Sequence, residues 1–308
     1  MVTLPSSVTA FHTELTVPVA GGRLTVAVAG PGEPGAAVVL GAHGITASHR
    51  SLEALARHLA AREITFLAPD LRGRGASSGL PGPYGLDAHV ADLVAVLDYW
   101  GAQRAVLVGH SMGAYLVTRL AAAHPDRCAG VVLVDGGLSL PVPTHLDPEA
   151  VLEAILGPAL ARLRMEFASP QDYRDFWRRH PAFGSRWNAD VERWVDYDVT
   201  GPPGALRVRM AEKAVRTDGR DILDSAAAWA ALTAAPGPVS LLRAPRGLAD
   251  ENRPLIPEAV VGRARQTVPG LAHLLVEDTN HYLIVLGDRE AGTVVTEIAR
   301  VVASPGAG

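Results

Sequence analysis

A serine between two glycines, in Gly109-His110-Ser111-Met112-Gly113, separates two segments of different periodicity. The apolar run Ala105–Val108 before it is typical of a buried strand, and Ala114–Leu120 after it is typical of a helix. In this setting Gly-x-Ser-x-Gly is the pattern of a nucleophile elbow, whose glycines let strand and helix approach closely. The turn would present the Ser111 hydroxyl at the helix N-terminus, where free N–H groups favour a developing negative charge. The pattern therefore predicts attack by Ser111 on a carbonyl carbon.

A serine nucleophile requires a general base, which chain order places in the loop after the last strand. The string Asp278-Thr279-Asn280-His281-Tyr282 follows the predicted strand Ala272–Val276 and occupies that place. We therefore predict that His281 is the base. The chain has 11 histidines, so position selects this one. We interpret His110 as structural and His273 as a core or edge residue of the last strand.

Two carboxylates are the main candidates to orient His281, and Glu251, next to the first of them, is a minor competitor. Asp250 lies in the loop after the predicted strand Pro238–Leu242, and it is our first choice. The order Ser111, Asp250, His281 is the order of nucleophile, acid and base expected for an elbow of this type. Asp135 is the rival, because it ends the strand that follows the elbow and could reach His281 from a neighbouring strand.

An oxyanion intermediate requires two N–H donors aimed at one point. We predict that the backbone of Met112, the residue after the nucleophile, supplies one of them. The second is expected from Ile45, in the turn after the predicted strand Ala37–Leu40. Gly44 would let this turn bend toward the substrate, and His43 would brace it. We also expect His43 and Gly44 to lie beside the substrate.

Short apolar runs alternate with helical stretches, which predicts βαβ units and a mostly parallel sheet with helices on both faces. Besides the strand before Ser111, the runs predicted as strands are Thr13–Val19, Leu24–Ala29, Ala37–Leu40, Ile64–Ala68, Val131–Asp135, Pro238–Leu242 and Ala272–Val276. The stretches predicted as helices are Ser48–Ala61, Leu86–Trp100, Leu283–Leu286 and Ala291–Val302.

The alternation stops between Leu138 and Pro236, a stretch that is helical in pattern and poor in strands. It holds Trp177, Trp187, Trp194 and Trp229. We predict an inserted helical cap at residues 138–236, with the core formed by residues 1–137 and 237–308. Most of the aromatic side chains would form the core of the cap itself, while Trp177, Trp187 and Tyr282 are expected to contact substrate.

Composition excludes several classes of protein. The 308 residues are 48% hydrophobic and 19% charged with a net charge of −4, so there is no large basic field for nucleic acid. No apolar run approaches the roughly 20 residues that span a bilayer. The N-terminus lacks the pattern of a signal peptide, which makes the cytoplasm the expected location. Cys128 is the only cysteine, so we expect neither an intrachain disulfide nor a metal site built from cysteines.

Four strings together resemble the α/β-hydrolase fold of capped serine hydrolases. They are Gly41-Ala42-His43-Gly44, Asp70-Leu71-Arg72-Gly73-Arg74-Gly75-Ala76-Ser77, Gly109-His110-Ser111-Met112-Gly113 and Asn280-His281. The resemblance covers most of residues 9 to 302. It implies eight core strands, of which only the second is antiparallel, and a structural loop in which Asp70 and Arg72 form an ion pair. The loop that bears Asp250 is longer than the common Gly-x-x-Asp form of this family.

The resemblance and the triad together imply an esterase or lactonase that acts through an acyl-enzyme on Ser111. The expected substrate is a small to medium, fairly apolar carboxylic ester, with lactones and thioesters as close variants. Carbon–carbon bond hydrolysis and cofactor-free perhydrolysis use the same triad and stay open. A serine nucleophile argues against the epoxide hydrolases and haloalkane dehalogenases of this fold, which use aspartate. A ligand-binding protein without turnover is the alternative of another class. We expect no metal, no organic cofactor, no nucleic-acid or membrane partner, and a monomer or homodimer.

Overall fold

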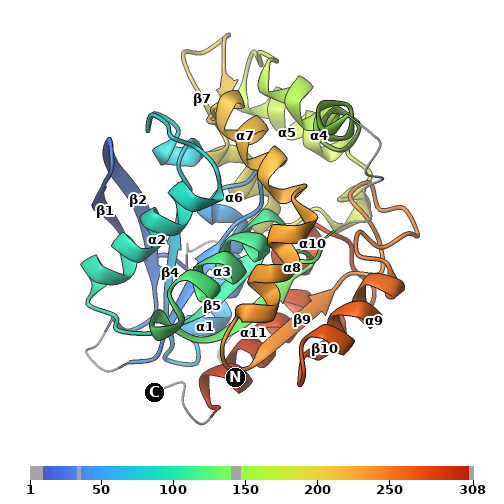
Figure 1. Cartoon of the computed structure of the whole chain (residues 1–308). Helices are drawn as coiled ribbons and strands as arrows, with labels where there is room; N and C mark the ends of the chain where they lie inside the picture. The colour runs from blue at the N-terminus through green and yellow to red at the C-terminus, as the bar shows by residue number, and fades with distance from the viewer. Residues whose placement is uncertain (1–9, 33–35, 140–146, 305–308) are drawn as a thin grey trace.

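Eight strands form a single sheet in the order β1-β2-β4-β3-β5-β6-β9-β10 (Figure 1). The computed structural model describes residues 10–32, 36–139 and 147–304. The strands are β1 (Thr13–Val19), β2 (Gly22–Ala29), β3 (Val38–Ala42), β4 (Thr65–Pro69), β5 (Ala105–His110), β6 (Cys128–Val134), β9 (Val239–Arg243) and β10 (Ala272–Leu275). Only β2 runs antiparallel to its neighbours. The predicted fold class is therefore confirmed, including its single antiparallel second strand.

The central strands β3, β5 and β6 are almost entirely apolar, because both of their faces are covered. In β5, Ala105 and Leu107 face one apolar cluster, whereas Val106 and Val108 face the other. This alternation follows from the period of two along a strand. The continuous apolar run before the elbow is therefore a strand buried on both sides.

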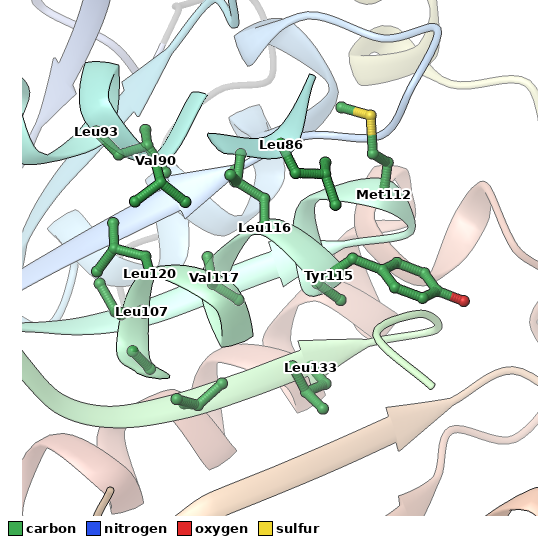
Figure 2. Packing of buried hydrophobic residues seen from close by; sticks show 14 of the residues in the cluster. Leu86, Val90, Leu93, Leu107, Met112, Tyr115, Leu116, Val117, Leu120 and Leu133 are labelled. Carbon is green, nitrogen blue, oxygen red and sulfur yellow. The ribbon is translucent and has the colours of Figure 1, made fainter. Parts of the chain in front are cut away.

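Helices cover the two faces in separate groups. The first group is η1 (His49–Leu52), α1 (Glu53–Ala60), α10 (Leu283–Leu286) and α11 (Asp288–Val302). The second group is α2 (Leu86–Trp100), α3 (Met112–Ala123), α8 (Ser225–Ala234) and α9 (Glu258–Thr267). Figure 2 shows how Leu86, Val90 and Leu93 of α2 meet the side chains of α3 above the sheet. This packing fixes α3, and with it the turn before α3.

Among the described residues between β6 and β9 are five α-helices and a small hairpin. They are α4 (Pro148–Leu163), α5 (Pro170–Arg178), α6 (Ala189–Tyr197), β7 (Val199–Thr200), β8 (Arg207–Val208), α7 (Glu212–Ile222) and α8. Figure 1 shows α4, α5 and α7 grouped at the top of the view. Residues 147–222, which comprise α4 to α7, are called the insert below. By contrast, α8 packs on α3 beside the sheet.

The region predicted as a cap, 138–236, thus contains the insert and also a helix that lies on the sheet. Its residues 140–146 fall outside the described residues. Two further short 3-10 turns, η2 (Gly75–Ser77) and η3 (Pro125–Arg127), follow β4 and α3, and a third, η4 (Gly184–Arg186), lies in the insert. None of the helices in the described ranges is long and apolar enough to cross a membrane.

Candidate active site

The turn between β5 and α3 holds Ser111 in a strained backbone conformation. Its φ of 55° and ψ of −120° lie outside the regions that residues with a side chain usually adopt. A Cβ on Gly109 would lie 2.1 Å from the Gly113 carbonyl oxygen, and one on Gly113 would lie 2.0 Å from that of Ala42. Both glycines are therefore required by close backbone approach.

His281 is oriented by a buried carboxylate. Its Nδ1 lies 2.7 Å from Asp135 Oδ2, and the side chains are 4% and 0% exposed. The other oxygen of Asp135 accepts a hydrogen bond of 3.1 Å from the Ala244 N–H. With both oxygens engaged, the carboxylate has one orientation. A Cβ on Gly136 would lie 2.2 Å from the Ser111 carbonyl oxygen, so the end of β6 passes directly against the elbow.

The expected contact between Asp250 and His281 is wrong. Asp250 Oδ1 accepts a hydrogen bond of 2.9 Å from Asn280 Nδ2, and its Oδ2 lies 2.8 Å from an Arg246 nitrogen. Asn280 Oδ1 in turn accepts from the Leu283 N–H at 3.0 Å and so holds the turn that carries His281. The structure thus pairs His281 with the rival carboxylate, and Asp250 supports the adjacent residue.

His110 links the elbow to the loop of the base. Its Nε2 lies 2.8 Å from the His281 carbonyl oxygen, to which it donates, and the two rings are 4.8 Å apart. Burial, together with the neighbouring His281, holds the pKa of His110 well below its usual value. A neutral imidazole donating from Nε2 matches the structural interpretation of this residue.

His43 holds the turn after β3 through hydrogen bonds to the backbone. Its Nε2 accepts a hydrogen bond of 3.0 Å from the Leu71 N–H, so Nδ1 carries the proton and donates to the Gly44 carbonyl at 2.8 Å. Burial lowers the pKa of His43 to about 3, which keeps it neutral. The Gly44 carbonyl and the Ile45 N–H belong to one planar peptide and point in opposite directions. His43 therefore aims the Ile45 N–H.

A cavity of about 270 Å³ brings these groups together. Ser111, His281, Asp135, Ile45 and Met112 all line it. A Cβ built on Gly44, which also lines the cavity, would lie 3.8 Å from Ser111 Oγ, so the turn after β3 lies beside the nucleophile. Met112 is the first residue of α3, where no acceptor of the helix itself is available to its N–H.

The rest of the cavity wall is largely apolar and comes from the insert, the turn after β3, the loop after β9 and α10. Trp177 and Tyr282 line it as expected. Two other residues that were expected to contact substrate do not line the cavity. His43 is 0% exposed and lies behind the cavity lining. Trp187 packs on Phe183 and donates to Glu192 Oε2 at 3.0 Å, away from the lining.

Residues 37–288 match the sequence family described as the alpha/beta hydrolase fold. The chain belongs to this family. Two relatives from Mycobacterium tuberculosis (strain ATCC 25618 / H37Rv) are similar over part of its length. Lipase LipV is 44% identical over 109 residues, which are 35% of this chain and 41% of the relative. Epoxide hydrolase A is 36% identical over 211 residues, which are 67% of this chain and 61% of the relative. The chain therefore matches less than two thirds of each.

A solved structure of similar fold is that of E-2-(acetamidomethylene)succinate hydrolase. It superposes with a TM-score of 0.76 over 95% of this chain and 99% of that one, at 21% sequence identity. At this identity the likeness concerns the fold. It agrees with the eight-stranded sheet and its flanking helices.

The structural loop of this hydrolase-fold chain has different partners from those predicted. Arg72 forms its ion pair with Asp92 of α2, through contacts of 2.9 and 2.6 Å. Asp70 instead accepts from the backbone N–H of His49 at 2.9 Å and from the Tyr197 hydroxyl at 2.7 Å. The expected pair of Asp70 and Arg72 is thus wrong, although both side chains do brace the loop.

Two buried arginines near the site escaped sequence analysis. Arg162 of α4 lines the cavity, pairs with Asp198 at 2.5 Å and lies 5.0 Å from the centre of the Trp177 ring. Arg74, in the loop after β4, is 0% exposed. The only sequence feature that marks Arg74 is its place between Gly73 and Gly75. A charged residue between two glycines is ordinarily interpreted as part of a solvated loop.

Proposed function

We propose that this chain is a serine hydrolase that cleaves carboxylic esters through an acyl-enzyme on Ser111. The observation that carries the proposal is the strained Ser111 in one cavity with the His281–Asp135 pair. A strained serine at a helix N-terminus, beside an oriented imidazole, is an arrangement suited to nucleophilic catalysis.

In the proposed reaction, His281 Nε2 takes the proton of Ser111 Oγ as that oxygen attacks the ester carbonyl carbon. The N–H groups of Met112 and Ile45 stabilise the resulting oxyanion. His281 then protonates the leaving alkoxide, which departs as an alcohol. A water molecule, deprotonated by the same imidazole, then attacks the carbonyl carbon of the acyl-enzyme. His281 returns this proton to Ser111 Oγ as the bond between Oγ and the acyl carbon breaks and the carboxylic acid leaves. Asp135 accepts from Nδ1 throughout and stabilises the imidazolium that forms.

The cavity supports a small to medium, fairly apolar substrate. Apolar side chains of the insert, such as Ile155, Leu156 and Trp177, form much of its wall. We propose that the insert acts as a cap over the nucleophile. Lactones and thioesters fit the same chemistry. This chain is similar to Epoxide hydrolase A, but its elbow holds a serine. Epoxide opening on this fold uses an aspartate as the nucleophile, so the serine favours ester hydrolysis.

A fluorophosphonate probe tests the proposal directly. Folded wild-type protein should form a covalent adduct on Ser111, located by mass spectrometry of the peptide, and Ser111→Ala should form none. In parallel, p-nitrophenyl esters, lactones and a vinylogous diketone should be offered to both proteins. Ester turnover that Ser111→Ala lowers by roughly 10⁴-fold or more supports the proposal. Intact wild-type protein with neither adduct nor turnover would refute it.

A further inference from the structure

Three consecutive carbonyls in the turn after β3 are each bonded by a buried side chain. His43 donates to the Gly44 carbonyl at 2.8 Å. Arg74 Nε donates to the Ile45 carbonyl at 3.1 Å. Arg162 donates to the Thr46 carbonyl at 3.4 Å, a longer and weaker contact. Within the turn, the Ala47 N–H also donates to the Gly44 carbonyl at 3.2 Å. The Ile45 and Thr46 carbonyls are held by the two arginine side chains.

Arg74 contacts both proposed oxyanion residues. Besides its bond to the Ile45 carbonyl, its terminal nitrogen lies 4.0 Å from Met112 Sδ. The guanidinium also donates to the Arg72 carbonyl at 3.0 Å. Each of these groups is fully or almost fully buried, so water cannot replace a lost partner.

The charge of Arg74 is balanced by the insert. Its guanidinium is hydrogen-bonded to Asp218 of α7, and both side chains are 0% exposed. The core holds the same carboxylate on its other side. The Gly85 N–H donates to Asp218 Oδ1 at 2.8 Å, and His89 Nε2 lies 2.9 Å from Oδ2. Asp218 therefore has one position, and it fixes the guanidinium in turn.

The backbone of the loop is paired with the insert as well. The Gly75 N–H donates to the Arg209 carbonyl at 3.0 Å, and the Ala211 N–H donates to the Gly73 carbonyl at 2.9 Å. A Cβ on Gly73 would lie 2.6 Å from the Cβ of Ala214 on α7. The insert therefore packs directly on the loop after β4.

We propose that Arg74 and Asp218 are positioning residues for the turn after β3 that carries the Ile45 N–H, called the oxyanion turn below. Packing of the insert against the core then fixes the direction of this N–H. The inference rests on the proposed function, since it concerns the oxyanion of that reaction. Asp218 holds Arg74, and Arg74 holds the peptide that follows Ile45. An oxyanion donor stabilises the transition state only if its direction is fixed before the reaction. The insert would thus contribute to rate as well as to the cavity wall.

The chain offers a matched control. Arg72 and Asp92 form a second buried ion pair, 2% exposed on each side, and Arg72 belongs to the same loop. Arg72 donates to the Pro81 carbonyl at 2.8 Å and not to the oxyanion turn. Loss of either pair should destabilise the fold, because it leaves a buried charge without its partner. Only loss of the Arg74 pair should affect the turn.

The experiment compares Arg74→Met and Asp218→Asn with Arg72→Met and Asp92→Asn. For each variant we would measure kcat and KM for an ester, and the inhibition constants of an alkyl boronic acid and of the product alcohol. The boronic acid forms a tetrahedral adduct with a serine oxygen, whereas the alcohol does not. We expect the Arg74 and Asp218 variants to lose about tenfold to 10²-fold in kcat, with a matching loss in boronic acid affinity. KM and alcohol affinity should stay within about twofold.

A further variant keeps the test valid if these proteins fold poorly. Arg74→Lys retains a cation for Asp218 but loses the fixed guanidinium that reaches the Ile45 carbonyl. It should recover most of the thermal stability while kcat and boronic acid affinity stay low. The inference is overturned if the Arg74 and Asp218 variants bind the boronic acid as well as the Arg72 and Asp92 variants do. If wild-type protein neither hydrolyses esters nor takes the fluorophosphonate, the proposed function fails and the inference with it.

Discussion

His281 Nδ1 lies 2.7 Å from Asp135 Oδ2, a contact that joins the loop after β10 to the residue after β6. β6 is the direct neighbour of β5, the strand that leads into the elbow. The carboxylate, the imidazole and Ser111 therefore meet at the carboxyl ends of strands near the centre of the sheet, where ligands bind in open α/β sheets. Asp250 lies farther out, after β9, and bonds to Asn280.

Replacing Asp135 should therefore cost far more activity than replacing Asp250. Asp135→Asn preserves shape but favours the wrong tautomer of His281, and we expect kcat/KM to fall roughly 10³-fold to 10⁴-fold. Asp250→Asn should change it by no more than about fivefold, since an amide oxygen can still accept from Asn280. Ester kinetics on both variants decide between the two carboxylates. A larger loss in Asp250→Asn would assign the acid to Asp250.

Replacing Gly44 by alanine should affect activity, whereas replacing Gly113 by alanine should affect stability. On Gly44 a Cβ would lie 3.4 Å from Ser111 Cβ, an ordinary contact, and its φ is not positive. We expect Gly44→Ala to fold with near-normal thermal stability while losing roughly 10²-fold in kcat/KM, because the methyl crowds the oxyanion turn. On Gly113 the Cβ would lie 2.0 Å from the Ala42 carbonyl oxygen. Gly113→Ala should therefore be strongly destabilised, and equal melting temperatures for the two variants would contradict this account.

The sheet was predictable because its strands are buried on both faces. Runs such as Ala105–Val108 leave little alternative to a central parallel strand, and glycines two residues before and after Ser111 mark the elbow. The base was predictable for a related reason, since His281 lies between the last strand and an apolar helix. Local pattern and tertiary fold agree at these positions.

Partners across the fold were not predictable in the same way. Asp135 and Asp250 both follow strands that end at one edge of the sheet, and spacing does not say which reaches His281. Arg72 pairs with a carboxylate 20 residues away on α2, because the loop turns its side chain toward that helix. Tertiary placement decides each of these contacts, and nothing local marks it.

Aromatic composition likewise did not separate Trp177 from Trp187. Trp177 lines the cavity, while Trp187 packs on Phe183 outside it. Trp177→Phe should enlarge the cavity and shift the ratio of kcat/KM between a bulky and a small acyl ester by roughly tenfold or more. Trp187→Phe, which removes a similar volume, should leave that ratio within about twofold. A series of acyl chain lengths measures the ratio, and equal shifts in the two variants would contradict the cavity assignment.

His43 should make the stability of the protein fall as the pH is lowered through the range just below neutrality. Burial, together with Arg74 and His49, lowers the pKa of His43 to about 3 despite the opposing effect of Asp70. The unfolded chain takes up this proton near pH 6.5, whereas the folded chain does not. The unfolded state is therefore favoured as the pH falls below that value. From pH 7.5 to pH 5.0 this group alone should remove about 2 kcal/mol from the free energy of unfolding.

Urea unfolding at those two pH values measures this loss. Burial shifts the pKa of His110 in the same direction, so His110 should add to the loss caused by His43. Asp218, whose pKa is lowered to about 2, stays ionised over this range and contributes nothing to the difference. His43→Gln provides the control. It should be less stable than wild type at pH 7.5, but its loss between the two pH values should be smaller by about 2 kcal/mol, because glutamine does not titrate. An equal pH dependence in both proteins would show that His43 is not the neutral brace of the turn that carries the Ile45 N–H.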